Sequence, residues 1–504
     1  MKHIVLIGMI LIVVLVSGCT QTDGDPSPSI IIDLEYMGNP SVGEELLIRL
    51  HINPATGLGE EFFDTQASVE FDLPDSFELL EGESVQNIVF TDFETKTIEI
   101  KVKPTETGNF DVKSTLAKQN SGQFWKTIQV AVSTPPEQNN MFALDLYNRY
   151  KSEDGNLFFS PYSISSALSM TYEGAKGQTA EEMQAVLHLP DDKNKIRADF
   201  VSIYDELNKA DKSYKLTAAN ALWAQEDYPF VDEYFNVVDE YYDGKVTNLD
   251  FKTDTENSRV TINDWVEDKT NDKIKDLIPE GILSSATKLV LTNAIYFKAN
   301  WSNQFDVENT WDGKFKLSSG QDVDARMMHK TTNYSYGETD NLQILEMDYI
   351  GNDLSMLIIL PKDNKLNQVE NDFSKEKLED WKNNMQTEKV RVTLPKFKFE
   401  TKYFMAEDLK EMGMPTAFRY PDADFTGMSP TGELFISEVI HQTFIEVAEY
   451  GTEAAAATAV ISGEGSAGPT EEPKIFNADH PFIFIIQQKD SGNILFMGRM
   501  SDPS

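Results

Sequence analysis

The sequence is poor in the residues that build covalent cross-links, metal centres and nucleophilic active sites. Its 504 residues include one cysteine, Cys19, so no disulfide can form within the chain. The chain has only six histidines, and four of them lack the spacing of metal ligands: His51, His188, His329 and His480. The Gly-x-Ser-x-Gly motif of many hydrolases is absent. These shortages argue against a metal centre and against a hydrolase.

Positive charge is scarce as well. The chain has 44 Lys and Arg against 83 Asp and Glu, a formal net charge of -39. An acidic surface repels polyanions, so we expect no nucleic-acid partner. A Gly-x-Gly-x-x-Gly pattern does occur at Gly463, Gly465 and Gly468. Two prolines and two glutamates follow it instead of a helix start, so we reject a phosphate site there.

The first 28 residues carry targeting signals. A short basic start precedes an apolar run from 4 to 16, which has the length of a signal peptide and is too short to cross a bilayer. The run ends in LVSGC, which resembles a lipobox. We therefore expect residues 1–18 to be a lipoprotein signal peptide, Cys19 to carry a lipid, and residues 19–28 to form a flexible tether. The mature protein is expected outside the cytoplasm, anchored to the membrane, or secreted if Cys19 is not acylated.

The next stretch, residues 29–133, alternates apolar and polar residues with the period of a β-strand. The segments ELLIRLHI, ASVEFDLP, TIEIKVK and TIQVAV show this pattern, and Gly, Pro and Asn separate them. The pattern predicts a small all-β sandwich that resembles immunoglobulin-like surface modules. No catalytic motif is visible in it. Two roles stay open, a spacer that holds the next domain away from the membrane and a specific adhesion module.

A second domain follows at residues 137–504, after a linker expected at residues 134–140. Pro135 and Pro136 cannot continue a β-ladder, and the residues after them have a helical pattern. Beyond this point helical and strand periods alternate without the regular order of a parallel βαβ sheet. A total of 504 residues fits two folded units of this kind. We therefore expect a large α+β domain.

Six segments of this second domain resemble the serpin family, in the same order and at the same spacing: NLFFSPYSISSALSMTYEGAKGQTAEEM, LTNAIYFKANWSNQF, MMHK, VTLPKFKF, FIEVAEYGTEAAAATAV and FNADHPFIFIIQQKDSGNILFMGRM. The resemblance runs from about Glu137 to the end of the sequence. It implies an α+β serpin fold with three β-sheets and eight or nine helices. It also implies a monomeric serine protease inhibitor that is not an enzyme and needs no cofactor.

The resemblance identifies the segment from Gly451 to about Pro473 as a reactive loop. In this family a protease cleaves the loop and becomes covalently attached to it, and the hinge then inserts into the main sheet and distorts the protease. Every second residue of an inserting strand faces the core and must be small and uncharged, as Thr452, Ala454 and Ala456 are. The hinge assigned in this way contains Glu449, Gly451, Thr452, Glu453, Ala454, Ala455, Ala456, Ala457 and Thr458.

Other serpin residues can be carried over one by one. The resemblance assigns a hydrogen-bonded group beneath the opening point of the main sheet to Ser160, Ser163, Asn293 and His441. It assigns Trp301 to the place where the loop enters the sheet. It assigns Lys396 and Glu449 to an ion pair at the top of that sheet.

The target protease is less closely defined. Counting forward from Gly451 places the scissile bond near Gly465 and Ser466, and counting back from Phe476 places it near Ala467 or Gly468; Glu464 is a fifth candidate. Small residues favour an elastase-like or subtilisin-like protease, Glu464 leaves a glutamate-selective one open, and the absence of Lys and Arg argues against trypsin-like targets. Two other functions remain open, a non-inhibitory serpin and a surface adhesion protein that acts through the β-sandwich.

Overall fold

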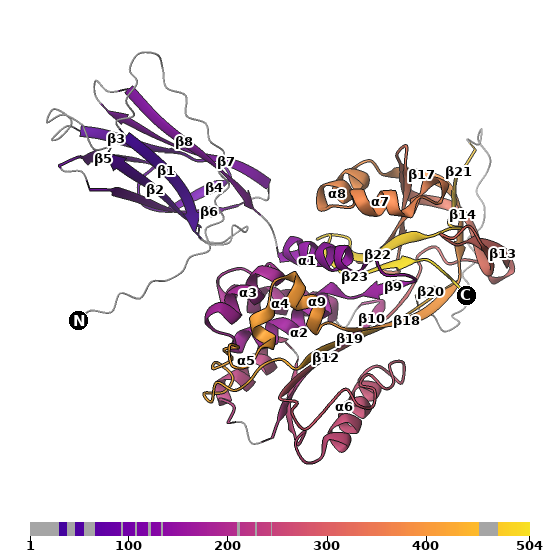
Figure 1. Ribbon diagram of the computed structural model, residues 1–504. Helices are drawn as coiled ribbons and strands as arrows, with labels where there is room; N and C mark the ends of the chain where they lie inside the picture. The colour runs from indigo at the N-terminus through magenta and orange to yellow at the C-terminus, as the bar shows by residue number, and fades with distance from the viewer. Residues whose placement is uncertain are drawn as a thin grey trace. The chain divides into compact units, whose positions relative to one another are not determined.

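The computed structural model describes residues 30–37, 46–54, 66–91, 94–105, 108–118, 122–132, 135–208, 212–226, 229–242, 244–452 and 472–504 (Figure 1). The expected signal peptide, Cys19, the tether and loop residues 453–471 lie outside these ranges. The chain divides into two compact units, Met1–Pro135 and Pro136–Ser504. In the part of the chain that is described, no helix is both long and apolar enough to span a membrane.

The first unit contains two four-stranded antiparallel sheets. One has the order β1-β2-β6-β4 and the other β5-β3-β7-β8. The strands are β1 Ile30–Met37, β2 Leu46–Pro54, β3 Gln66–Asp72, β4 Phe77–Glu81, β5 Val85–Val89, β6 Lys96–Pro104, β7 Gly108–Lys118 and β8 Gly122–Val132. In β2 every second residue is buried, as the alternating sequence predicts. Inward residues of both sheets, such as Ile48 and Val112, belong to one apolar core.

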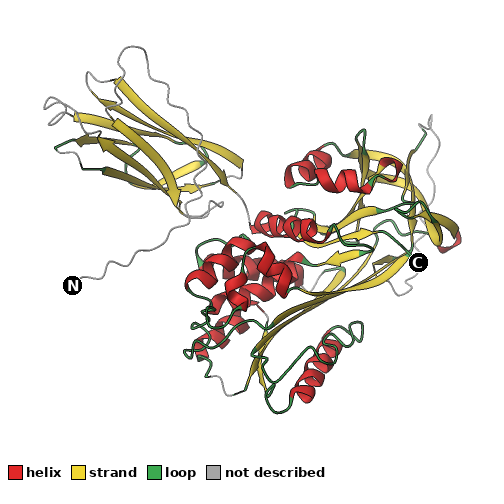
Figure 2. Cartoon of the chain, in the orientation of Figure 1, coloured by secondary structure: helices red, strands yellow, loops and turns green. Residues whose placement is uncertain are grey.

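The second unit has nine α-helices among its described residues (Figure 2). They are α1 Pro135–Tyr150, α2 Pro161–Gly174, α3 Gly177–Leu187, α4 Lys193–Asn208, α5 Asp232–Tyr242, α6 Thr255–Lys269, α7 Leu366–Asp372, α8 Lys375–Asn383 and α9 Ala406–Met412. Helix α1 begins at Pro135, inside the stretch 134–140 that was expected to be a linker. Proline is compatible with the first turn of a helix because the N–H groups there need no partner within the helix.

Two sheets accompany these helices. The six-stranded sheet has the order β11-β10-β12-β20-β19-β18. Its strands are β10 Tyr214–Gln225, β11 Lys245–Leu249, β12 Leu289–Asn300, β18 Phe397–Phe404, β19 Glu438–Ala448 and β20 Gly451–Thr452. Alternate residues of β10 and β12 enter different cores. Leu222 and Leu291 face the core that contains α2, whereas Trp223 and Val290 face the core beneath α6.

The remaining strands form one nine-stranded sheet with the path β21-β17-β14-β15-β16-β22-β23-β9, to which β13 adds beside β14. The strands are β9 Leu157–Phe159, β13 Thr310–Lys316, β14 Asp322–Glu338, β15 Leu342–Asp348, β16 Leu354–Pro361, β17 Gln386–Pro395, β21 Lys474–Asn477, β22 Phe482–Gln488 and β23 Ile494–Met500. Three sheets were expected in this domain, but its described strands form two hydrogen-bonded sheets. The long strand β14 pairs with β17 and, near its end, with β15, so it joins the two smaller sheets into one.

Candidate functional site

The site is built around two neighbouring parallel strands, β12 and β19. Residues 290–295 of β12 pair directly with residues 438–443 of β19. The short strand β20 lies between the same two strands further along, antiparallel to both. The pair of strands is therefore joined at one end and separated by a third strand at the other.

Strand β20 occupies the separated end. Thr452 pairs with Ala299 of β12 on one side and with Val447 of β19 on the other. A Cβ atom at Gly451 would lie 2.0 Å from the carbonyl oxygen of Ala299 and 2.6 Å from the Cα of Asn300. Any side chain at this position would overlap the backbone of β12. Glycine is therefore required for β20 to lie so close to its neighbour.

Aromatic side chains close the core side of β20. The Thr452 hydroxyl is buried and lies 2.7 Å from the Tyr349 hydroxyl. The Trp301 ring stacks on Tyr349 with centroids 4.5 Å apart, and its Nε1–H donates to the carbonyl of Ala448 at 3.0 Å. The Trp301 backbone N–H donates to the carbonyl of Tyr450 at 2.9 Å. Burial raises the pKa of Tyr349, which therefore stays protonated as a hydrogen-bonding partner.

An ion pair holds the turn between β19 and β20. The Lys396 ammonium lies 2.7 Å from a carboxylate oxygen of Glu449, whose backbone carbonyl accepts from the Phe305 N–H at 2.8 Å. Burial of Glu449 opposes ionisation, but the hydrogen bond from Lys396 and its positive charge keep the pKa of Glu449 below its usual value. The carboxylate therefore stays ionised near neutral pH and anchors the last residues before the loop.

A row of polar side chains crosses the joined end. Asn220 of β10, Asn293 of β12 and His441 of β19 lie opposite one another in register. The Asn293 amide donates to the Asn220 side-chain oxygen and to the Ser163 carbonyl, the second at 2.9 Å. The Asn293 side-chain oxygen accepts from His441 Nδ1, and His441 Nε2 accepts from the Ser160 N–H at 3.1 Å.

These contacts decide the protonation state of His441. Nδ1 donates and Nε2 accepts, so the ring is in its neutral form with the proton on Nδ1. Complete burial lowers the pKa of His441 to about 3. A neutral imidazole therefore links β19 to β12 and to α2 without placing a charge in the core.

The first turn of α2 ties this row to the other sheet. Ser160 is the N-cap residue of α2, and its hydroxyl accepts from the Ser163 N–H at 3.2 Å. The same hydroxyl donates to the carbonyl of Leu495 in β23 at 2.7 Å. One serine thus joins the helix start to both sheets.

Sequence reasoning missed two further members of this row, Asn220 and Tyr403, and its neighbour Thr443. Tyr403 of β18 lies opposite His441, and its ring stacks on His441 with centroids 6.1 Å apart. Thr443 lies two residues further along β19, and its hydroxyl donates to the Phe158 carbonyl at 2.7 Å. Polar residues within apolar strands were the available signal, but only the strand register shows that Asn220, Asn293, His441 and Tyr403 share one row.

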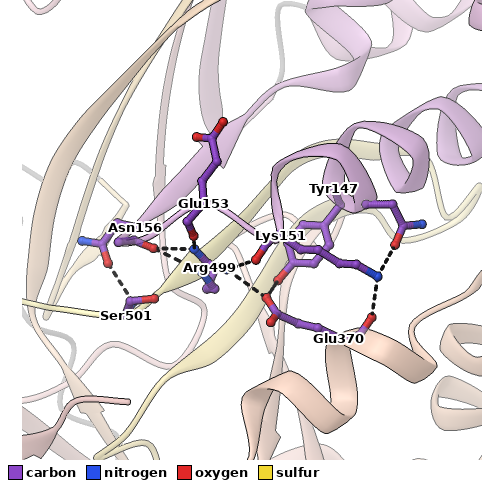
Figure 3. Close-up of polar contacts among 9 residues, drawn as sticks. Tyr147, Lys151, Glu153, Asn156, Glu370, Arg499 and Ser501 are labelled. Atoms are coloured by element: carbon purple, nitrogen blue, oxygen red, sulfur yellow. Dashed lines mark hydrogen bonds and ion pairs between the residues drawn. The ribbon is translucent and has the colours of Figure 1, made fainter. Parts of the chain in front are cut away.

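A buried ion pair connects β23, α7 and the end of α1, which we call the frame (Figure 3). Arg499 of β23 and Glu370 of α7 lie 3.1 Å apart, both almost fully buried, and the Tyr147 hydroxyl donates to the same carboxylate at 2.8 Å. The guanidinium also donates to the carbonyls of Lys151 at 2.8 Å and Gly155 at 2.9 Å, just after α1 ends. Sequence reasoning did not find this network, because Arg499 and Glu370 are 129 residues apart in the sequence and Tyr147 is 223 residues from Glu370.

The predicted site residues thus fall into two separate groups. One lies around β20 and contains Trp301, Lys396, Glu449, Gly451 and Thr452. The other lies at the joined end and contains Ser160, Ser163, Asn293 and His441. The remaining hinge residues, Glu453 to Thr458, and the candidates for the scissile bond, Glu464 to Gly468, lie outside the described residues. Within the described ranges, no cluster of His, Cys, Asp and Glu could hold a metal ion.

The arrangement has counterparts in known proteins. A profile of the family described as "Serpin (serine protease inhibitor)" matches residues 137–503. A serpin-like protein of Thermococcus kodakarensis is 47% identical over 365 residues, which cover 72% of this chain and 84% of that protein. The leukocyte elastase inhibitor of Bos taurus is 41% identical, covering 72% of this chain and 98% of its own. The crystal structure of Serpin48 of Tenebrio molitor aligns with a TM-score of 0.67 and 32% identity, over 73% of this chain and 98% of its own.

Proposed function

The chain belongs to the serpin family, and from this premise we propose that it inhibits serine proteases by a covalent suicide mechanism. A protease attacks the loop as a substrate, and its catalytic serine forms an acyl bond to the loop while the peptide bond breaks. The hinge then inserts between β12 and β19 and carries the protease with it. The acyl bond survives if insertion is faster than hydrolysis.

The observation that carries this proposal is the position of β20. The strand already lies between β12 and β19, with backbone pairing to both. Between β20 and the joined end, residues 296–298 of β12 and 444–446 of β19 are not paired with each other. An inserting segment that continues from Thr452 would find unpaired strand edges directly ahead.

The orientation of Thr452 supports the assignment of the hinge residues. Its side chain faces the core and lies against Tyr349. If the strand continues, Ala454, Ala456 and Thr458 face the core as well, and Glu453 faces the solvent. The inward residues are small and uncharged, as insertion requires.

The first unit and the N-terminal segment complete the proposal. We infer that residues 29–133 form an immunoglobulin-like sandwich that acts as a spacer, because β2 has alternating burial and the inward residues of both sheets form one apolar core. We also propose that Cys19 is acylated, which would anchor the monomeric inhibitor at the outer face of the membrane. Globomycin treatment or mutation of Cys19 should then release the protein from membranes or leave it unprocessed.

The test of inhibition is incubation with a panel of serine proteases. The expected result with elastase-like or subtilisin-like enzymes is a complex that survives boiling in detergent. Trypsin should form no such complex, because residues 453–473 contain neither Lys nor Arg. Cleavage of the loop by every protease without any stable complex would identify a non-inhibitory serpin instead.

Two loop variants test the insertion step itself. Ala456→Arg should place an unpaired charge in the core during insertion, which is strongly unfavourable, so the variant should become a substrate. Glu453→Arg changes the solvent-facing set and should still inhibit. The measurement is the number of inhibitor molecules consumed per protease inactivated. Efficient trapping by Ala456→Arg would contradict the insertion mechanism.

A further inference from the structure

One face of the nine-stranded sheet carries a row of side chains across four strands. The pairing of β14 with β17 places His329 opposite Thr393, and the pairing of β17 with β21 places Thr393 opposite Asn477. In the next row, Arg391 lies opposite Ile475. Side chains opposite one another in a sheet share a face, so these residues form one surface. Their neighbours Val392 and Phe476 are fully buried, so the face with the row is the solvent side.

An exposed aromatic stack ends this row. The Trp311 ring, on β13, stacks on the His329 ring with centroids 3.8 Å apart and an interplanar angle of 14°. Trp311 is nonetheless 49% exposed. His329 Nδ1 lies 3.1 Å from the Thr393 hydroxyl, and its Nε2 is buried without a hydrogen-bond partner in the described part of the chain. The Trp311 indole is held in place by stacking on His329 and still exposes half of its surface to solvent, so it is well suited to bind a partner.

The other end of the surface is also unoccupied. Ile475 is 61% exposed on β21. Arg391 beside it is exposed and makes no ion pair with any described carboxylate. None of the side chains named so far on this surface is acidic, although the chain carries 83 acidic residues. They are Trp311, His329, Arg391, Thr393, Ile475 and Asn477. Trp and Arg are the residues most enriched at the energetic centres of protein interfaces.

The surface lies between the two ends of the loop. At one end, Glu449 is paired with Lys396, and the Lys396 N–H donates to the carbonyl of Arg326 in β14 at 2.7 Å. Arg326 directly precedes Met327, which lies opposite Trp311. At the other end, β21 with Ile475 begins at Lys474, two residues after position 472, the first described residue beyond the loop. A protein bound to the loop would stand over this surface.

We propose that the surface formed by Trp311, His329, Arg391, Thr393, Ile475 and Asn477 is a second contact site for the protease that attacks the loop. The inference rests on the proposed function, because the loop is what brings the protease to this place. Trp311 and Ile475 supply apolar contacts at the two ends, and Arg391 pairs with a carboxylate of the protease. The loop itself is made of small residues, so this surface supplies the selectivity that the loop lacks.

The experiment measures binding of proteases whose catalytic serine is replaced by alanine, which cannot form the acyl bond. A subtilisin and an elastase of this kind serve as probes for the parent and for Trp311→Ala and Ile475→Thr. Trp311→Ala should weaken binding about tenfold or more, and Ile475→Thr a few-fold. A synthetic peptide with residues 449–473 should be cleaved by the active protease at a rate that neither substitution can affect, which gives the contribution of the loop alone.

Two matched controls are available. Tyr420→Ala removes an aromatic ring that is 61% exposed, next to the segment 415–418 that packs against α3 and α9. Ile31→Thr removes an isoleucine that is 58% exposed on β1 of the other unit. Neither should change the affinity. If Trp311→Ala fails to fold, the test is decided by Ile475→Thr, whose side chain is largely in solvent.

The outcomes separate this proposal from the proposed function. Binding that depends on Trp311 and Ile475 supports the contact site, even if no detergent-stable complex forms and inhibition is absent. Affinities within twofold of the parent for both variants would overturn it, even if inhibition is normal. It would also be overturned if none of the inactive proteases binds the parent. A parent dimer that Trp311→Ala converts to a monomer would mean that a second copy of this chain occupies the surface.

Discussion

The two ends of the β12–β19 junction differ in what holds the same two strands together. At the joined end, a direct ladder and a row of neutral polar side chains around Asn293 and His441 connect them. At the other end, β20 separates the strands, and its close approach depends on the absence of a side chain at Gly451. The joined end is held by hydrogen bonds that can change partners, whereas the separated end requires a residue without a side chain at position 451.

The difference shows how one sheet can be stable and still admit another strand. The polar row contains no ionised group, so its members can exchange hydrogen-bond partners without the large cost of leaving a buried charge unpaired. Ionised pairs lie outside this row, in Lys396–Glu449 beside β20 and in the buried Arg499–Glu370 pair. Opening is therefore favoured between β12 and β19, while the frame around them stays in place.

Gly451→Ala should disrupt the separated end of the junction and have the largest effect on function. The new methyl group would overlap the backbone of β12, so β20 could not occupy its place. Raising the activation free energy of insertion by about 1.4 kcal/mol slows insertion about tenfold relative to hydrolysis of the acyl bond. We expect a substrate with little trapping, measured as inhibitor consumed per protease inactivated. Thr452→Ser is the control, since it keeps the hydroxyl beside Tyr349, and should behave as the parent.

Glu370→Ala should weaken the packing of β23 against α7 and leave both ends of the junction intact. It leaves Arg499 buried without its carboxylate, which typically costs about 3–5 kcal/mol. We expect a loss of this size in the free energy of unfolding from denaturant titration, with the stoichiometry of inhibition unchanged. Glu407→Ala removes a 79% exposed partner of Lys410 and should change stability by less than about 0.5 kcal/mol. A similar loss for both variants would contradict the assignment.

Lowering the pH should weaken the joined end through His441. Its folded pKa of about 3 lies below the ordinary value of 6.5, so the unfolded state binds more protons between these values. Stability is then fully present above pH 6.5 and is lost as the pH falls toward 3, with a slope of about 1.4 kcal/mol per pH unit. The measurement is denaturant unfolding from pH 7 to pH 4.5. His441→Gln should be less stable at pH 7 but show a shallower pH dependence, and equal slopes would refute this.

Asn293→Ala should weaken the joined end by a smaller amount at neutral pH. The substitution leaves the His441 Nδ1–H without its acceptor, and an unsatisfied buried polar group costs about 1–3 kcal/mol. The Asn220 side-chain oxygen loses one of its two donors and keeps the Ser163 hydroxyl at 3.3 Å. Thermal unfolding should report the loss. Asn194→Ala, on the exposed side of α4, is the control, and an equal change in both variants would argue against a special role for the row.

Lys396→Met should have the smallest effect. The Lys396 side chain is 37% exposed, so solvent screens its interaction with Glu449, and we expect a loss below about 1 kcal/mol. The pKa of Glu449 should rise, because burial then opposes ionisation without the hydrogen bond and the positive charge of Lys396. NMR titration of the Glu449 carboxylate checks this shift. An unchanged pKa would mean that Lys396 does not stabilise the ionised form.

Much of the architecture follows from local sequence patterns. Alternation in ELLIRLHI predicts a strand with one buried face, and Leu46–Pro54 has that burial at every second residue. Six segments predicted the family, because they occur in the same order and at the same spacing as in serpins. The expected linker at 134–140 was wrong from Pro135 onward, since a proline is compatible both with an interruption and with the first turn of a helix.

The amino-acid sequence shows which residues are polar within apolar strands and which hinge positions are small. That Asn220, Asn293 and His441 share one row follows from the fold, because a register is set by the pairing of whole strands and a shift of one residue would point them to the other face. The neutral state of His441 has the same origin, because its low pKa comes from complete burial among distant segments. The Arg499–Glu370 pair likewise exists because packing brings β23 against α7, and neighbouring residues along the chain contain no sign of that contact.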